Sequence, residues 1–342
     1  MELPFLEATL WETAKHAAFN GDTADYDEMV GLLAGFEYIV RRLPTPVDHL
    51  VLTHPRSDER LRFPLVDPGT VWTDPEATAN RIRTIDAYMR SGVLDAAGFR
   101  CPSADECHAS ATVKGRDVYE GQLSYIGHHY DHWIGASRAR VAIIGQEYGH
   151  PPALMSLLER YRFVRDGKGA VPFEKRNPHM RGTTLALRLL LGLSLDDLSD
   201  DIIRTHNGHS IHLFEAFALV NALLCSAVEP GTTRGRSTRT MQENCLPHFV
   251  HTLRILEPSI VVVQGKGVAK WIRPAFNFWQ PRSDMPELVD AEHEGVPTLI
   301  ATFTHPSAFG KQNWSYPTSE YFRSVVEPTL SHARRLLSGV GT

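Results

Sequence analysis

Three short apolar runs, each ending at a glycine or a polar turn, constrain the fold of this chain most strongly. They are Val141–Gly145, Ile260–Val263 before Gly265, and Thr298–Phe303. The first two runs are followed by segments with helical spacing, 153–163 and 268–272. Strands that alternate with helices are typical of an α/β domain built on a parallel sheet. We therefore predict a three-layer α/β/α domain with a central, mostly parallel sheet.

The first hundred residues have a different pattern. Apolar residues recur at helical spacing over Phe5–Phe19 and Tyr26–Val40, and Pro75–Met89 has a proline near its start, as helices often do. The polar segment 100–121 is expected to be a loop or linker. A chain of 342 residues is long enough for two domains. We predict a mainly helical N-terminal extension over residues 1–110 and an α/β domain over residues 111–342.

Composition places the chain among ordinary globular proteins. Apolar residues make up 42% and charged residues 22%, which is enough apolar material for a core. No apolar run approaches the roughly 18 residues that span a bilayer. The first residues carry Glu2 and Glu7 and no basic start, so we expect a cytoplasmic protein without membrane contact. We also expect a monomer with no obligate protein partner.

Polar loops that follow the predicted strands are the places to look for chemistry, because ligands bind outside the carboxyl ends of such strands. Gln146 and Glu147 follow the first strand, where a carboxylate can hold a water and an amide can orient a substrate. A strand–helix turn with exposed polar residues is the alternative. His305 follows the last strand and could stabilise developing negative charge or act as an acid. A structural histidine that caps the next element is the alternative there.

The segment after Asn221 and Cys225 combines glycines, threonines and three arginines, namely Arg234, Arg236 and Arg239. Such a loop suits phosphate binding, although a solvated surface loop explains it as well. Because the formal net charge is -5, any contact with nucleic acid must rest on a local patch of this kind. His206, His209 and His212 form a regularly spaced run. The run could bind zinc, or its spacing could have arisen by chance in a histidine-rich chain.

Taken in order, these features resemble the uracil-DNA glycosylase superfamily, closest to its iron–sulfur branches, families 4 and 5. The likeness covers about residues 121–338. The loop Gly145–Gly149 is similar to the family's first motif, and Asn221 stands four residues before Cys225 as in its second block. His305-Pro306-Ser307 is similar to the closing motif.

The resemblance implies a [4Fe–4S] cluster. The family's cluster uses two cysteines upstream of the first motif and two that flank the arginine loop. This chain has Cys101 and Cys107 upstream, and Cys225 and Cys245 around the arginines. Thiolates suit such a cluster or zinc. His108 could complete a zinc site instead.

The resemblance further implies a DNA glycosylase, an enzyme that flips a base out of DNA and hydrolyses its N-glycosidic bond. In that mechanism His305 stabilises the departing base anion. Glu147, or alternatively Gln146, holds the attacking water. The flipped base is contacted by Asn221, His179 and Tyr148. DNA phosphates are contacted by Arg234, Arg236 and Arg239, and Ser307 also binds DNA. Phe309 is the wedge that fills the vacated stack. Trp314 is the alternative to Phe309 as the wedge.

The departures from the family concern the substrate. Tyr148 stands where families 4 and 5 usually have proline, and His179 takes the place of the family's stacking phenylalanine. A changed base pocket leaves uracil and a non-standard base, such as a bulky modified cytosine of phage DNA, both open; in the latter case the protein would act in phage defence. Two alternatives remain: a non-catalytic nucleic-acid-binding module with the same fold, and a metal-dependent hydrolase that uses the histidine run.

Overall fold

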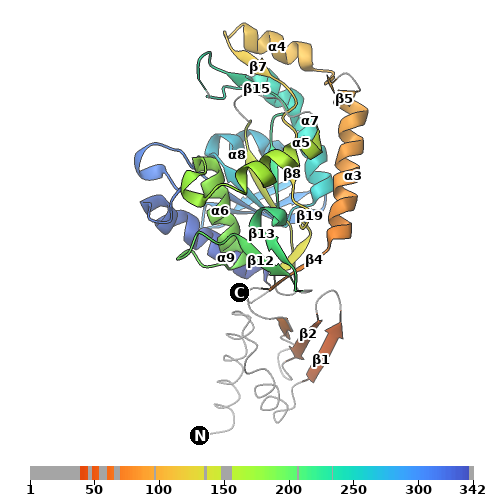
Figure 1. Cartoon of the computed structure of the whole chain (residues 1–342), viewed down its shortest axis with the longest axis vertical. Helices are drawn as coiled ribbons and strands as arrows, with labels where there is room; N and C mark the ends of the chain where they lie inside the picture. Colours follow the sequence, from red (N-terminus) through yellow and green to blue (C-terminus); the bar gives the residue numbers. More distant parts are fainter. Residues whose placement is uncertain are drawn as a thin grey trace.

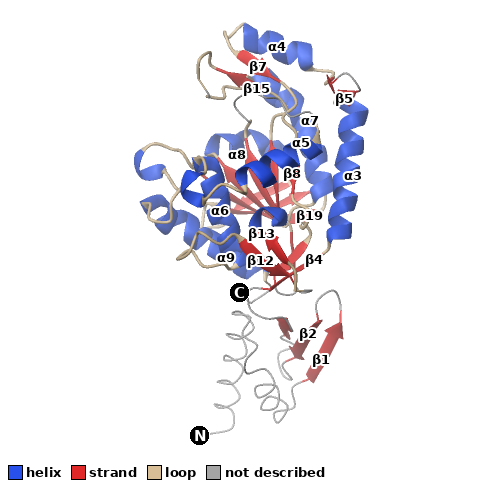
Figure 2. Ribbon diagram, in the orientation of Figure 1, coloured by secondary structure: helices blue, strands red, loops and turns tan. Residues whose placement is uncertain are grey.

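The computed structural model describes residues 39–44, 48–53, 60–64, 70–95, 98–134, 137–147, 156–205, 208–232 and 234–338. Its described part is a mixed α/β fold (Figures 1 and 2). The helices are α3 (Pro75–Gly92), α4 (Ala104–Thr112), α5 (Leu157–Tyr161), α6 (Pro178–Leu191), α7 (Arg239–Leu256), α8 (Lys266–Ile272) and α9 (Glu327–Leu337).

A seven-stranded sheet organises the core, in the order β17-β18-β19-β16-β11-β14-β8. Its four central strands are parallel, and antiparallel strands flank them on both sides. The strands are β8 (Tyr125–Ile126), β11 (Val141–Gly145), β14 (Phe217–Asn221), β16 (Ile260–Gln264), β17 (Phe278–Pro281), β18 (Leu288–His293) and β19 (Val296–Phe303). All three apolar runs of the sequence are therefore strands of one sheet.

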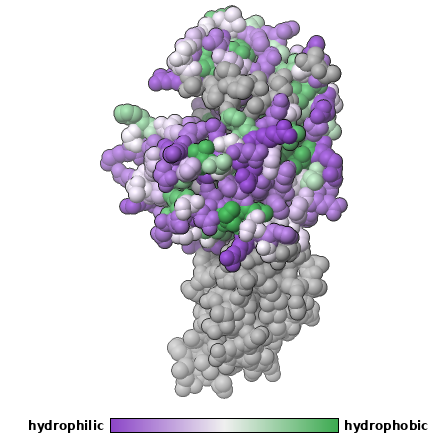
Figure 3. Space-filling model, viewed as in Figure 1, coloured by the Kyte–Doolittle hydropathy of each residue, from purple (hydrophilic) through white to green (hydrophobic). Residues whose placement is uncertain are grey.

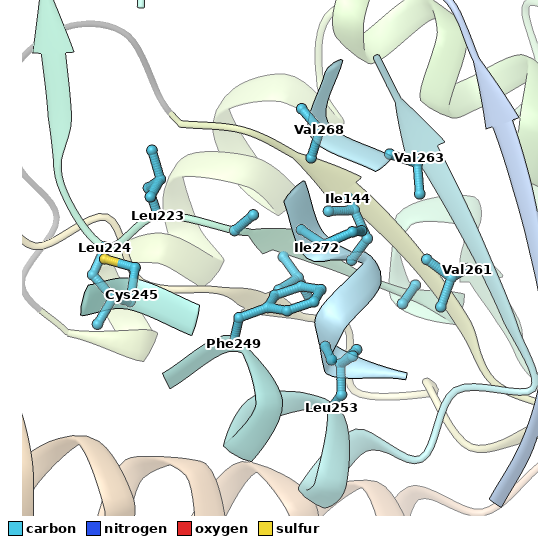
Figure 4. Packing of buried hydrophobic residues seen from close by; sticks show 14 of the residues in the cluster. Ile144, Leu223, Leu224, Cys245, Phe249, Leu253, Val261, Val263, Val268 and Ile272 are labelled. Atoms are coloured by element: carbon cyan, nitrogen blue, oxygen red, sulfur yellow. The ribbon is translucent and has the colours of Figure 1, made fainter. Parts of the chain in front are cut away.

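Both faces of this sheet are buried, and alternate residues of each central strand point to opposite sides. Ala142 and Ile144 of β11 belong to one hydrophobic cluster, whereas Val141 and Ile143 belong to another. The first cluster includes residues of α3, α4, α7 and α8, and the second includes residues of α6 and α9. Figure 4 shows the first cluster, in which Phe249 of α7 lies among side chains of the sheet and of α8.

Smaller sheets complete the fold. A five-stranded sheet runs β10-β9-β4-β12-β13, β15 pairs with the distant strand β7 in an antiparallel two-stranded sheet, and β5 pairs with β6. Their bounds are β4 (Thr70–Thr73), β5 (Leu94–Asp95), β6 (Gly98–Phe99), β7 (Asp117–Tyr119), β9 (His132–Ile134), β10 (Ser137–Ala139), β12 (Ile202–Thr205), β13 (Ser210–His212) and β15 (Ser226–Val228). A separate three-stranded sheet consists of β1 (Ile39–Pro44), β2 (Asp48–Thr53) and β3 (Arg60–Pro64).

The N-terminal part differs from the mainly helical extension expected over residues 1–110. The predicted helix at 75–89 is confirmed as α3, but residues 39–73 contribute the four strands β1–β4. The segment 100–121 was expected to be a loop, and it forms α4 and β7 instead, because Cys107 and Ala111 bury one side of α4 in the core. The proposed helix 5–19 and most of 26–40 lie outside the described residues.

No clean boundary falls near residue 110 in the described structure. The central strand of the five-stranded sheet is β4, which pairs with β9 and β12 from the α/β part. Arg81 of α3 also forms a buried ion pair with Asp131 at 3.0 Å and donates to the backbone oxygen of Ile255 on α7. Residues 70–110 are therefore integral to the α/β core.

Candidate functional site

The four central strands bring the predicted polar loops to one edge of the sheet. Along the chain these strands come in the order β11, β14, β16, β19, but in space they run β14-β11-β16-β19. The order reverses between β11 and β16, and ligands of open α/β sheets bind beyond the strand ends at such a switch point. Gly145 ends β11 and Gln264 ends β16, and Asn221 ends β14 in register with Gly145. We call Gly145, His179, Asn221, Gln264 and His305 the candidate site.

His305 is held in one tautomer by its own turn. The backbone N–H of Ser307 donates to Nδ1 of His305 at 3.2 Å, and the Ser307 hydroxyl lies 2.7 Å from the same atom. A backbone N–H can only donate, so Nδ1 must accept and the neutral ring carries its hydrogen on Nε2. Desolvation by the surrounding protein lowers the pKa of His305 below its ordinary value of 6.5. At neutral pH His305 is therefore an uncharged donor through Nε2–H.

His179 lies beside His305. The two rings are stacked with their centroids 6.2 Å apart. Burial and, to a smaller extent, the neighbouring His305 lower the pKa of His179 to about 3. His179 stands in the first turn of α6, whose N-cap Asn177 accepts a hydrogen bond from the Met180 backbone. Both histidines are thus neutral at physiological pH.

Gly145 allows this close packing. A Cβ atom at position 145 would lie 3.2 Å from Cε1 of His179 and 3.8 Å from Oδ1 of Asn221. A Cβ here would press on the His179 ring, whereas its contact with the Asn221 amide would be an ordinary one. The glycine that ends β11 therefore keeps the His179 ring close to the strand end.

Asn221 and Gln264 have amide orientations set by carbonyl partners. The side-chain amide of Asn221 donates to the backbone oxygen of Gln122 at 3.2 Å. That of Gln264 donates to the backbone oxygen of His179 at 3.3 Å and to Thr183 at 3.0 Å. Sequence reasoning missed Gln264. The available signal was its position directly after a predicted strand, which matches that of Gln146 after Gly145.

Gln146 and Glu147 point toward the segment that follows β15. The Glu147 carboxylate accepts from the Ala227 backbone N–H at 2.8 Å and from that of Ser237 at 3.3 Å. The Gln146 amide donates to Glu147 at 2.5 Å and to the Ser237 hydroxyl at 3.2 Å. Burial raises the pKa of Glu147, although these hydrogen bonds oppose the rise. The two residues lie next to the candidate site, with the carboxylate already occupied by backbone donors. Tyr148 lies outside the described residues.

The arginine loop, residues 229–238, connects β15 to α7. Arg236 pairs with Glu229 at 3.0 Å, and Arg239 at the start of α7 pairs with Glu243 at 2.7 Å. Arg234 is exposed and shows no ion pair with another described residue. Such exposed pairs contribute little to stability, so phosphates can compete for these guanidinium groups.

Phe309 and Trp314 have opposite environments. Phe309 is fully exposed, at 101% of its reference area, four residues beyond His305. Trp314 is completely buried, donates to the Thr304 backbone oxygen at 2.6 Å and packs against Phe303. The alternative in which Trp314 serves as a wedge is therefore wrong, because a core residue is not available to DNA. Ser307 holds His305, as described above.

The four cysteines, which come from separate segments, lie near one another. Cys107 on α4, Cys225 before β15 and Cys245 on α7 are buried, and Cys101 is half-buried. Burial raises the pKa of the Cys107 thiol, and it raises that of Cys245 to about 12. The charge of Cys101 contributes to both of these rises, and the other three cysteines contribute in the same way to the raised pKa of Cys225. Within the described ranges, no three potential ligands form a ready-made single-ion site.

Two polar side chains, Asn244 and His248, lie beside cysteine sulfurs. Asn244 donates to the Cys107 sulfur at 3.6 Å. His248 lies one turn beyond Cys245 on α7, with Nε2 3.8 Å from the Cys101 sulfur and Nδ1 2.7 Å from the Tyr88 hydroxyl. His108 instead lies 2.8 Å from Glu120. The histidine next to the cysteines is therefore His248, which sequence reasoning did not single out.

The regularly spaced histidines have other roles where they are described. Nδ1 of His212 accepts from the Phe214 backbone at 3.0 Å, and Nε2 lies 4.0 Å from the buried carboxylate of Asp201. Burial lowers the pKa of His212 to about 4. His209 is exposed, and His206 lies outside the described residues. His212 thus serves the packing of β13.

Comparison with known proteins does not assign the chain to a family. No protein-family model matches it, and no curated protein matches it. None of the described helices is both long and apolar enough to cross a membrane. Figure 3 shows that hydrophilic residues cover much of the described surface in that view.

Proposed function

We propose that this chain is a DNA glycosylase that binds a flipped base at the candidate site and hydrolyses its N-glycosidic bond. The observation that carries the proposal is the convergence of Gly145, His179, Asn221 and His305 at the switch point of the sheet. These residues come from segments that are far apart in sequence. Together they form a set of neutral, hydrogen-bonding groups suited to a nucleobase.

His305 would stabilise the negative charge that develops on the departing base. Cleavage of the bond leaves negative charge on the departing base and positive charge on the sugar. A neutral imidazole whose Nδ1 is occupied by Ser307 offers Nε2–H to that negative charge. Such a preorganised donor is worth roughly 10²–10³-fold in rate in comparable sites.

Asn221 and His179 would lie against the base. Their side chains lie beside Gly145 at the strand end, where they would hydrogen-bond the edge of a base. Uracil and a modified cytosine both remain candidate substrates, the latter in a role in phage defence.

DNA would approach the same edge of the fold. The exposed ring of Phe309 follows His305 and is suited to fill the gap left by a flipped base. Arg234, Arg236 and Arg239 would bind phosphates. We infer DNA as the partner of a cytoplasmic, monomeric protein, and a three-layer α/β/α arrangement for the domain.

The four cysteines fit a [4Fe–4S] cluster, with zinc as the alternative. All four donors are thiols, three are buried, and Asn244 supplies a hydrogen bond to sulfur. A bound metal would supply positive charge that compensates the thiolates, which burial otherwise disfavours. Its part would be structural, because Cys225 and Cys245 flank the arginine loop while Cys107 belongs to α4. The cysteines would fasten that loop to the core.

The proposal is tested by measuring abasic sites in DNA. The purified full-length protein is incubated with a uracil-containing duplex and with genomic DNA carrying modified cytosine. We expect abasic sites in at least one substrate, and a loss of about 10²–10³-fold in the single-turnover rate for His305→Ala. DNA binding without abasic sites in either substrate would favour the non-catalytic module instead.

A further inference from the structure

Glu147 forms a direct link between the candidate site and the arginine loop. Its carboxylate accepts one hydrogen bond from Ala227 before the loop and one from Ser237 at the end of the loop. Both donors are backbone N–H groups, so the link depends on where the chain runs and not on which side chains the loop carries. One side chain thereby closes a loop of about ten residues at its two ends.

Neighbouring contacts support this link. Gln146 and Gln242 both donate to the Ser237 hydroxyl, at 3.2 and 3.0 Å. The Arg236 backbone N–H donates to the backbone oxygen of Ala227 at 2.6 Å, and this hydrogen bond holds the two ends of the loop together. Gly235 lies directly over the carboxylate, since a Cβ there would be 2.5 Å from Cδ of Glu147. The side chain is thus enclosed by the loop that it holds.

This geometry does not match a carboxylate that activates water. Two charge-assisted hydrogen bonds from the backbone and a third from Gln146 already engage both oxygens, two of them on Oε1 and one on Oε2. Removing the carboxylate would leave two N–H groups without a partner beside the site. The contacts of Glu147 are therefore those of a group that fixes backbone.

We propose that Glu147 is a positioning residue that holds the arginine loop against the candidate site, so that Arg234 and Arg236 meet DNA phosphates in a fixed arrangement. This inference rests on the proposed function. Glu147 then orders the arginine loop and strengthens DNA binding, and it does not hold the attacking water.

The test compares Glu147→Gln, which keeps the shape but loses one acceptor and the charge, with Gly235→Ala, which displaces the carboxylate without removing it. Glu76→Gln, an exposed carboxylate at the start of α3, controls for the change in net charge. Hydrogen exchange over residues 226–239 is measured in DNA-free full-length protein. We expect exchange about tenfold faster in both loop variants and unchanged in the control.

DNA binding provides the second readout. The probe is a duplex with a stable abasic-site analogue, titrated at several salt concentrations. We expect Glu147→Gln and Gly235→Ala to raise the Kd about tenfold and to reduce the salt slope by about one phosphate contact. The single-turnover rate at saturating DNA should fall much less than the affinity.

Wild-type loop exchange and affinity in Glu147→Gln, together with a large loss of single-turnover rate, would overturn the inference and return Glu147 to the water-holding role. If the wild-type protein released no base from any substrate, the proposed function would fail. The exchange measurement would still show whether Glu147 holds the loop.

Discussion

Two neutral histidines define the candidate site at the scale of single residues. His305 is kept neutral by desolvation and by the Ser307 N–H, and His179, in the first turn of α6, is kept neutral mainly by desolvation. Their pKa values are lowered for the same physical reason, because an imidazole is less easily charged where surrounding protein replaces part of its water. Neutral rings can hydrogen-bond a base edge without a fixed charge competing for DNA phosphates.

Phe309→Ala tests the proposed wedge. The side chain is fully exposed, so its removal should leave the midpoint of thermal unfolding unchanged within error. Base release from duplex DNA should slow by about tenfold or more, since a stacked aromatic ring contributes about 1–3 kcal/mol. Single-stranded DNA has no stack to refill, so its rate should change little. Equal losses on both substrates would rule out a wedge.

Strand ends were the part of the site that the sequence could predict. Gly145 ends one buried apolar run and His305 follows another, and parallel strands necessarily bring such positions to one edge. Asn221 could not be placed in this way, because the periodicity of 217–224 fits a strand or a helix. The direction of the Glu147 side chain was not predictable, because its partners are backbone groups of a distant loop. Trp314 was misjudged as a possible wedge because large aromatic residues look alike in sequence whether exposed or buried.

The pairing of elements explains why the N-terminal part was harder to predict. The short strands β4 and β7 carry no long apolar run, and they are stabilised by partners far along the chain, β9, β12 and β15. Helix α4 is likewise short and holds its place through Cys107 and Ala111. By contrast α3 has a proline at its start and an Asp74 N-cap, both readable from sequence.

Cys245→Ser tests whether the cysteines fasten the arginine loop. We expect the wild-type protein, purified without oxygen, to contain iron and acid-labile sulfide in equal amounts, or zinc if that is the metal held. The variant should lose most of this metal. Its loop should then be cut by trypsin about tenfold faster at Arg234 and Arg236, because one anchor of the loop is gone. Unchanged cleavage despite loss of metal would show that the loop is held by other contacts.

At the scale of the whole molecule, neutral buried histidines link folding to pH. Burial lowers the pKa of His132 to about 4 and that of His179 to about 3. Between those values and about 6.5, the unfolded chain binds protons that the folded chain does not. The contribution of these two histidines to the free energy of unfolding is therefore fully present above pH 6.5. It is lost progressively as the pH falls toward 4.

His132→Asn measures this linkage. His132 is completely buried in β9 and lies 3.0 Å from the Tyr130 carbonyl. One histidine contributes a slope of up to about 1.4 kcal/mol per pH unit between pH 6 and 5. Denaturant unfolding at several pH values should show the variant less stable at pH 7.5 but with a flatter decline on acidification. An unchanged slope would mean that His132 is not neutral in the folded protein.

Abasic-site formation is the measurement that bears most directly on the central claim, that the edge of the sheet around Gly145 and His305 cleaves bases from DNA. Full-length protein and His305→Ala are compared on a uracil-containing duplex and on DNA with modified cytosine. The proposed function predicts abasic sites on at least one substrate with the wild-type protein and a rate lower by about 10²–10³-fold with the variant. Equal rates with both proteins would contradict it, and so would the absence of abasic sites on every substrate tested.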